Sequence, residues 1–365
     1  MIPYVEIRDK KTYKTLAIIE AQECWFELCY QDVGEFEIYC RASKVNLFAL
    51  QKGRFVTIPN KPYIWFITSV QYTFTAGGAR MISATGYEAK WLLNKRCILS
   101  PKELNGTITS AIYGLVSANI GATASTARKI VGFDVSTNDL PIDISGTQAP
   151  RENLLAFVTT LLKANGCGHI ATLENGAIRY TVFEGEDKTQ SVRFSQSLDN
   201  LLSSEYLTDD SKVANYALVV STFDETTTDA NGVEQKRKTD YTQAVDTGAT
   251  GIDRAEIVVS SNLSTKYEDA TGTEQETTPT SDLYKGWQKA EGETALTEHI
   301  TIEEINGEID IVNSNYTFAE DFFMGDLVRV QDDYFNFGAA TLITKYTFKQ
   351  DANGYGEEAE YGGKQ

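Results

Sequence analysis

The chain has 365 residues, of which 42% are hydrophobic and 23% are charged. This length and composition predict about two to four domains with apolar cores, which excludes a disulfide mini-domain and a wholly disordered chain. The net charge of -18 disfavours a broad nucleic-acid or anionic-membrane surface, because both need basic side chains.

Residues 1–100 are expected to form a compact β domain. Apolar and acidic residues alternate between Glu35 and Ile38, which is typical of a half-buried strand. Residues 24–40 thus predict two strands around a turn at 32–34. Further strands are expected at 55–59, 63–75 and 80–86, with Gly77 and Gly78 in a tight turn.

Residues 101–190 are expected to form a small α+β domain. Apolar residues at helical spacing predict one helix over 107–120 and a second helix that has Pro150 in its first turn and ends at Asn165-Gly166. The Asn175-Gly176 pair predicts a hairpin turn between strands at 168–173 and 177–183.

The remainder predicts a second β-barrel-like domain, made of residues 191–223 and 300–365. Strands are expected at 191–194, at 216–223 and from residue 300 to 348. An acidic segment at 224–299 is inserted between the two parts. It contains a turn at 229–232, a mobile loop at 271–280 and a short helix capped by Ser281 and Asp282.

An internal repeat links the first and last parts of the chain. Residues 53–58 and 66–74 resemble residues 325–330 and 341–348, with 19 positions from Gly53 to Tyr72 and 21 from Gly325 to Tyr346. The repeat predicts two similar β-barrel-like domains. The expected fold class is therefore α+β, mostly β, with these two domains, the small α+β domain and the inserted β/α segment.

Charge is distributed unevenly along the chain. Residues 1–100 carry a net charge of +4, residues 101–200 carry -2 and residues 201–365 carry -20. We expect the first domain to supply much of the docking surface, with the acidic residues facing water. The candidate interface residues are Lys52, Arg54, Asp326 and Arg329. Alternatively, both repeats share the interface and the acidic residues lie mainly in the inserted loops between residues 224 and 310.

Catalytic and metal-binding patterns are weak. The two histidines are His169 and His299, and we expect His169 to be structural and partly exposed. Residues 166–171 match the letters of a dinucleotide-binding fingerprint, but they follow a helix and open a strand, which is the reverse of the required context. We therefore expect no enzyme activity, cofactor or metal.

The five cysteines are odd in number and lack a C-x-x-C pair, so we expect free and mostly buried thiols. The sequence has no long apolar run and no signal peptide at its start, which predicts assembly in the cytosol.

Six blocks in order along the chain carry a family resemblance: Trp25 with 34–38, then 52–56, 86–96, 199–202, 215–219, and 324–328 with 353–355. Together they resemble the tail-tip or baseplate hub proteins of long-tailed bacteriophages. The resemblance implies a homotrimer whose two β-barrel-like domains per subunit form a pseudo-sixfold ring.

The same resemblance implies partners. The ring would dock on the distal tail protein and tail tube proteins, and the tape measure protein and a receptor-binding protein are further candidates. The hub would close the tube at the virion tail tip, after assembly in the host cytoplasm, and open for transient DNA passage.

Two alternative functions remain at this point. A carbohydrate-binding receptor protein would need exposed aromatic platforms, for which Trp65, Trp287 and the many tyrosines are candidates, although core packing explains most of them. A hub with peptidoglycan hydrolase activity is the other alternative. Many relatives continue into a hydrolase or fibre-like extension, whereas this sequence ends at Gln365, directly after the second repeat, so we expect no lytic activity.

Overall fold

The structure is a computed structural model that describes residues 4–74, 77–228, 234–269, 271–300, 302–334, 337–352 and 354–362. Strands outnumber helices, so the predicted α+β, mostly β class is confirmed. The elements in chain order are β1 (Val5–Arg8), β2 (Thr15–Ile19), β3 (Glu23–Cys29), β4 (Glu35–Arg41), α1 (Lys44–Ala49), β5 (Phe55–Thr57), β6 (Ile64–Phe74), β7 (Arg80–Glu88), η1 (Ala89–Lys95), β8 (Lys102–Leu104), α2 (Ile108–Asn119), β9 (Phe133–Val135), β10 (Thr147–Ala149), α3 (Leu154–Ala164), β11 (Gly168–Glu174), β12 (Ala177–Phe183), β13 (Arg193–Ser195), η2 (Gln196–Leu198), β14 (Leu201–Asp209), β15 (Tyr216–Thr228), β16 (Glu234–Asp246), η3 (Gly251–Asp253), β17 (Glu256–Ser260), β18 (Lys266–Glu268), β19 (Glu274–Glu276), α4 (Asp282–Thr297), β20 (Ile302–Asp310), β21 (Leu327–Asp332), β22 (Phe337–Asp351) and β23 (Gly354–Gly362).

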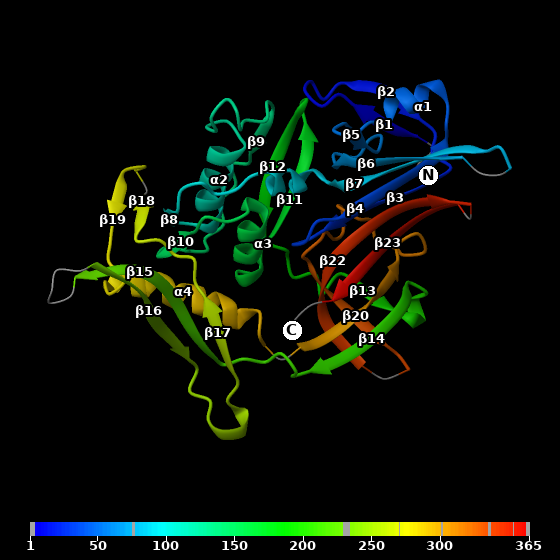
Figure 1. The fold of residues 1–365 in the computed structure, drawn as a ribbon. Helices are drawn as coiled ribbons and strands as arrows, with labels where there is room; N and C mark the ends of the chain where they lie inside the picture. Colours follow the sequence, from blue (N-terminus) through cyan, green and yellow to red (C-terminus); the bar gives the residue numbers. More distant parts are fainter. Residues whose placement is uncertain are drawn as a thin grey trace.

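A 13-stranded sheet contains strands from both ends of the sequence. Its main path runs β14-β20-β23-β22-β3-β4-β7-β6-β5-β1-β2, and β13 and β21 branch from it beside β22. Figure 1 shows the red strands β22 and β23 between the blue N-terminal strands and the β14–β20 pair. One apolar core includes residues from Val5 through to Tyr361.

The expected closed barrels are not seen. The path among the described strands has two ends, β14 and β2, because neither strand pairs with a further strand that would close it. The predicted strands are nevertheless present. In particular, β3 and β4 alternate buried and partly exposed residues, as the period-2 pattern of residues 24–40 predicts.

The middle of the chain forms a second core from helices α2 and α3 and the small sheet β11-β12-β9. The predicted hairpin turn is confirmed: Asn175 and Gly176 have positive φ values of 50° and 77°. The predicted start of the second helix was wrong. Helix α3 begins after Asn153, whose side chain accepts hydrogen bonds from the backbone N–H groups of Leu155 and Ala156, so Pro150 precedes the helix.

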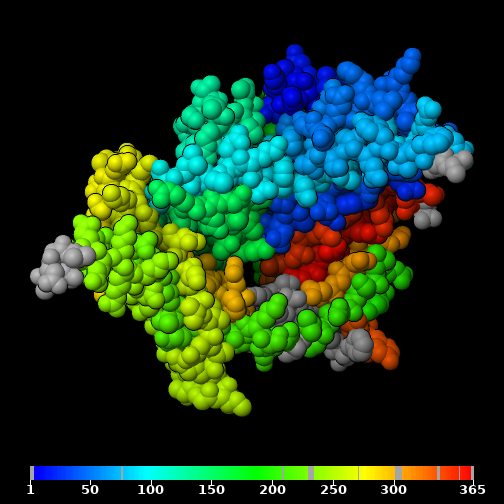
Figure 2. Space-filling view, in the orientation of Figure 1, coloured from blue at the N-terminus to red at the C-terminus, as the bar shows by residue number. Residues whose placement is uncertain are grey.

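The inserted segment is more regular than its composition predicted. Strands β15 and β16 form a long antiparallel hairpin, and β17 pairs with β15 in parallel. The strand predicted at 216–223 for the second β-barrel-like domain is the first part of β15, so it lies in this three-stranded sheet and not in the 13-stranded one. Residues 271–280, expected as a mobile loop, contain β19, which pairs with β18. Figure 2 shows this yellow-green segment at one end of the molecule, away from the blue N-terminal residues. The predicted turn at 229–232 lies outside the described residues.

Helix α4 is longer than the short helix that was expected after Ser281. As predicted, Ser281 caps the helix: its hydroxyl oxygen accepts the backbone N–H of Tyr284. Gly292 belongs to the face that packs on the hairpin. A Cβ there would lie 2.9 Å from Val219 and 2.8 Å from Val245, so the glycine permits this close approach. None of the described helices combines the length and apolar character that a membrane crossing requires.

The two repeat blocks share backbone geometry at their glycines. Gly53 and Gly325 have φ values of +88° and +84°. The Gly53 N–H donates to the carbonyl of Ile67 at 2.8 Å, and the Gly325 N–H donates to the carbonyl of Ile343 at 2.7 Å. The strand register then shifts directly after each isoleucine, where β6 meets β7 and where β22 meets β23.

These shared features correct the sequence alignment of the blocks. Ile67 corresponds to Ile343, so the interval from the glycine is 14 residues in the first block and 18 in the second. Tyr72 therefore corresponds to Phe348 and not to Tyr346. The sequence comparison matched the Tyr-Thr-Phe letters, whereas the hydrogen bonds match the Ile-Thr pairs that form the bulges.

Candidate assembly interface

The two ends of the sequence are joined where β3 pairs with β22. Leu28 lies opposite Tyr346, and Phe26 lies opposite Phe348. All four side chains are at most 1% exposed, so this strand pair is a core junction and not a surface contact. The Tyr30 N–H extends the pairing by donating to the carbonyl of Thr344 at 2.8 Å.

A buried ion pair fixes the turn beside this junction. The Glu88 carboxylate accepts the Gly34 N–H at 2.7 Å and lies 3.2 Å from the Lys90 ammonium. The ammonium also donates to the carbonyls of Cys29 at 2.6 Å and His169 at 3.0 Å. Burial raises the pKa of Glu88, and the charge of Lys90 partly opposes this shift. The pair therefore ties the first half of the chain to the middle core.

His169 is fully buried, which corrects the expectation of a partly exposed imidazole. Its Nδ1 lies 2.8 Å from the Tyr180 hydroxyl and its Nε2 lies 2.9 Å from the carbonyl of Gln31. Burial lowers the pKa of His169 well below its ordinary value, and the nearby charge of Lys90 adds to the shift. Because both ring nitrogens have protein partners, His169 is not placed as a base for a substrate.

Two strand edges expose apolar side chains. Beyond Ile67, β6 pairs with β7 alone among the described strands, and Tyr72 and Phe74 are 57% and 69% exposed. Strand β14 pairs only with β20 within the described part of the chain, and Leu207 is 40% exposed. Open sheet edges with apolar side chains are suited to strand addition.

The four residues selected from the sequence do not form one cluster. Lys52 is exposed ahead of β5, and Arg329 is exposed on β21. The Arg54 guanidinium instead donates to the carbonyl of Ala49 at 3.0 Å. Asp326 is 5% exposed, and its carboxylate accepts the N–H groups of Glu186 and Phe323, each at 2.7 Å. Lys52 and Arg329 are therefore the two exposed residues of the four.

The aromatic platforms required for the carbohydrate alternative are absent at the two predicted positions. Trp65 and Trp287 are 0% and 1% exposed. The Trp65 Nε1 donates to the carbonyl of Glu27 at 2.9 Å, so Trp65 helps to pack the junction between the halves. Trp287, on helix α4, packs against Tyr284 of the same helix and against Tyr267 of β18.

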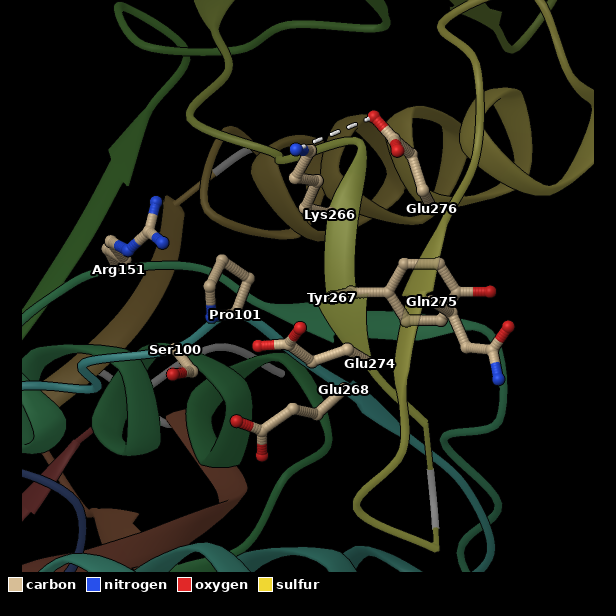
Figure 3. Close-up of a pocket in the computed structure, with 9 residues that line it drawn as sticks. All are labelled: Ser100, Pro101, Arg151, Lys266, Tyr267, Glu268, Glu274, Gln275 and Glu276. Atoms are coloured by element: carbon tan, nitrogen blue, oxygen red, sulfur yellow. Dashed lines mark ion pairs between the residues drawn. The ribbon is translucent and has the colours of Figure 1, made fainter.

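A polar pocket lies beside β18 and β19 (Figure 3) and has a volume of about 330 Å³. Lys266 lies 3.9 Å from Glu276 across its rim, and both side chains are largely exposed. Within the described residues, no three His, Cys, Asp or Glu side chains come together as metal ligands would. The pocket is lined by Ser100, Pro101, Arg151, Lys266, Tyr267, Glu268, Glu274, Gln275 and Glu276.

Sequence reasoning did not select Tyr72, Phe74 or Leu207. The sequence carried no signal for the first two, because Val70, Tyr72 and Phe74 alternate with polar residues as the buried residues of a strand do. No signal marked β14 either, since exposed leucines are common on protein surfaces.

Comparison with known proteins assigns the chain to a family. The family model described as Siphovirus ReqiPepy6 Gp37-like protein matches residues 4–362. The chain belongs to this family. The sequence-based recognition of a long-tailed phage protein is thereby confirmed. No curated protein matches the chain.

Solved structures of tail proteins share the fold. A tail protein from Neisseria meningitidis MC58 is 13% identical, with a TM-score of 0.55 and coverage of 99% of this chain and 96% of that one. The 43 kDa tail protein of prophage MuSo2 from Shewanella oneidensis is 12% identical, with a TM-score of 0.54 and coverage of 98% of each chain. Prophage tail protein gp18 from Listeria monocytogenes is 10% identical, with a TM-score of 0.50 and coverage of 98% and 94%.

Proposed function

We propose that this chain is a non-enzymatic structural hub at the tip of a phage tail. The observation that carries the proposal is its similarity to tail proteins over nearly the full length of both chains, together with its siphovirus family. The buried histidine and tryptophans favour this function over hydrolysis and carbohydrate binding.

The proposed hub is a homotrimer in which each subunit contributes two related β units. The first unit is residues 1–100, and the second is residues 191–223 with 300–365, although the strand at 216–223 pairs with β16 and β17 of the inserted segment. The matched glycines, isoleucine hydrogen bonds and bulges of the two repeat blocks support a duplication. Three copies would then present six similar surfaces to the distal tail protein and the tail tube.

The charge distribution supports an orientation for the hub. Residues 1–100 carry +4 and residues 201–365 carry -20, so the first unit is the proposed docking surface. Acidic residues facing the tube would repel a passing DNA duplex and prevent it from binding to the wall. In this proposal the hub closes the tube and opens for DNA on host attachment.

Immunogold labelling of intact virions and mass measurement in solution test this function. We expect label at the tail tip and a mass three times that of the chain. Lys52→Glu should weaken binding to the purified distal tail protein at low salt by about tenfold or more, whereas Lys285→Glu, at an exposed lysine of helix α4 in the inserted segment, should not. Label along the tail shaft or on the head would contradict the proposal.

A further inference from the structure

The correspondence between the two repeat blocks extends to their neighbouring strands. On one side, β6 pairs with β7, β7 with β4 and β4 with β3. On the other side, β22 pairs with β23, β23 with β20 and β20 with β14. All of these pairs are antiparallel. Strand β14 is therefore the counterpart of β3, and β6 is the counterpart of β22.

One contact in this scheme lacks its counterpart within a single chain. Strand β3 covers the edge of β22 at residues 345–350. The corresponding contact would place β14 against the edge of β6 at residues 69–74. The main path instead begins at β14, and β6 is separated from it by several strands (Figure 1). One chain thus carries the two strands of a second junction, β14 and β6, but they are too far apart in that chain to pair with each other.

We propose that β14 of one copy pairs antiparallel with the open edge of β6 in a second copy of this chain. The register of the β3–β22 pair can be applied to the proposed β14–β6 pair. On β6, Ile67 takes the place that Ile343 has on β22. On β14, Tyr206 takes the place that Leu28 has on β3, because the two residues hold matching positions in the β14–β20 and β3–β4 pairs. Tyr206 then lies opposite Val70. One residue further along, Leu207 lies opposite Ser69.

The backbone of β6 is oriented for this pairing. Thr344 and Thr68 occupy the same bulge position, and each threonine hydroxyl donates to the carbonyl across the bulge, at 3.3 Å to Glu360 and 3.5 Å to Thr85. The carbonyl of Thr344 faces β3 and accepts the Tyr30 N–H. Since alternate strand residues face the same edge, the N–H groups of Val70 and Tyr72 face the open edge of β6.

Burial and charge favour a copy of the same chain as the occupant. Tyr72 is 57% exposed, whereas its counterpart Phe348 is fully buried under β3. Tyr206 is 55% exposed, whereas its counterpart Leu28 is 1% exposed. The pairing also brings the +4 region of residues 1–100 against the -20 region of residues 201–365.

The contact is head-to-tail, because a different edge is used on each copy. Such a contact builds a ring when the rotation closes and a filament when it does not. That the ring contains three copies rests on the proposed function. That β14 pairs with β6 does not depend on the proposed function.

Disulfide trapping tests the register. Ser69 and Leu207 occupy the position of a non-hydrogen-bonded pair, in which the side chains are close enough for a disulfide. Mixing chains that carry Ser69→Cys with chains that carry Leu207→Cys should give covalent dimers under mild oxidation. Neither variant alone should do so beyond the wild-type background. Ser69→Cys mixed with Tyr206→Cys is the matched control, because those side chains lie on opposite faces and should not cross-link.

A proline scan tests the edge independently. Tyr72→Pro removes a backbone N–H that faces the open edge of β6. It leaves the backbone N–H and C=O groups of Gln71 and Thr73, which face β7. The chain should therefore fold but self-associate at least tenfold more weakly. Tyr72→Ala keeps the N–H and should associate more tightly than Tyr72→Pro. A trimer that survives Tyr72→Pro and gives no Ser69–Leu207 cross-link would overturn the edge pairing while leaving the proposed hub intact. A wild-type chain that stays monomeric even at about 100 times the protein concentration used in these assays would overturn both the edge pairing and the proposed hub.

Discussion

At the scale of single residues, the buried Lys90 is the most consequential charge in the chain. Lys90→Met leaves the Glu88 carboxylate buried without its cation and frees the carbonyls of Cys29 and His169. We expect a loss of about 3–5 kcal/mol in the free energy of unfolding, measured by urea denaturation. Lys163→Met is the control, because its exposed pair with Asp32 should contribute less than about 1 kcal/mol. A similar small loss for both variants would contradict the role of the buried pair.

The buried His169 predicts a pH dependence of stability. Its pKa is lowered in the folded chain, so below the unfolded value of 6.5 the unfolded state binds a proton that the folded state excludes. Stability is therefore present above pH 6.5 and is lost as the pH falls. From pH 8 to pH 5.5 we expect this residue to cost about 1.4 kcal/mol. His169→Gln does not titrate, so its unfolding free energy should fall less over the same range; parallel curves for the two proteins would refute the assignment.

At the scale of elements, the two repeat glycines form a matched pair. Both have positive φ, but a Cβ on Gly325 would lie 2.3 Å from the Tyr30 ring, whereas the nearest atom to a Cβ on Gly53 is Lys10 Cδ at 3.8 Å. Gly53→Ala should cost about 1–2 kcal/mol through backbone strain alone. Gly325→Ala adds overpacking and should cost about 1–3 kcal/mol more. Equal melting temperatures for the two variants would contradict this difference in packing.

At the scale of the whole molecule, the cysteines report on both cores. Cys24 and Cys40 lie in the core of the large sheet, and Cys167 lies in the middle core. Burial raises the pKa of Cys24 to about 12 and the pKa values of Cys40 and Cys167 to about 11. Burial also raises the pKa of the half-buried Cys29, so the exposed Cys97 should be the one thiol that reacts rapidly in the native protein, and Cys97→Ser should remove that reaction.

Denaturation without reductant should then release five reactive thiols, as expected for a chain that lacks disulfides. Three or fewer titratable groups would show that disulfides form in the protein. Because Cys24 and Cys167 lie in different cores, the denaturant concentrations at which they become reactive also show whether the two cores unfold together.

Local structure could be predicted from the sequence. The strands at β3, β4, β11 and β12, the Asn175-Gly176 turn and helix α2 follow from alternation, turn chemistry and helical spacing among residues close in the chain. The family was recognised for a similar reason, since its blocks are short and keep their order along the chain.

The tertiary structure decided which edges meet. Strand β22 pairs with β3 although more than 300 residues separate them, and no periodicity specifies the partner of a strand. The same packing buried His169 and Trp65, which the sequence left open to other roles, and kept Tyr72 exposed although it alternates like a core residue. The alternation of a strand is a short-range property set by the backbone, whereas burial depends on which distant strand covers it, and that is determined only when the chain has folded.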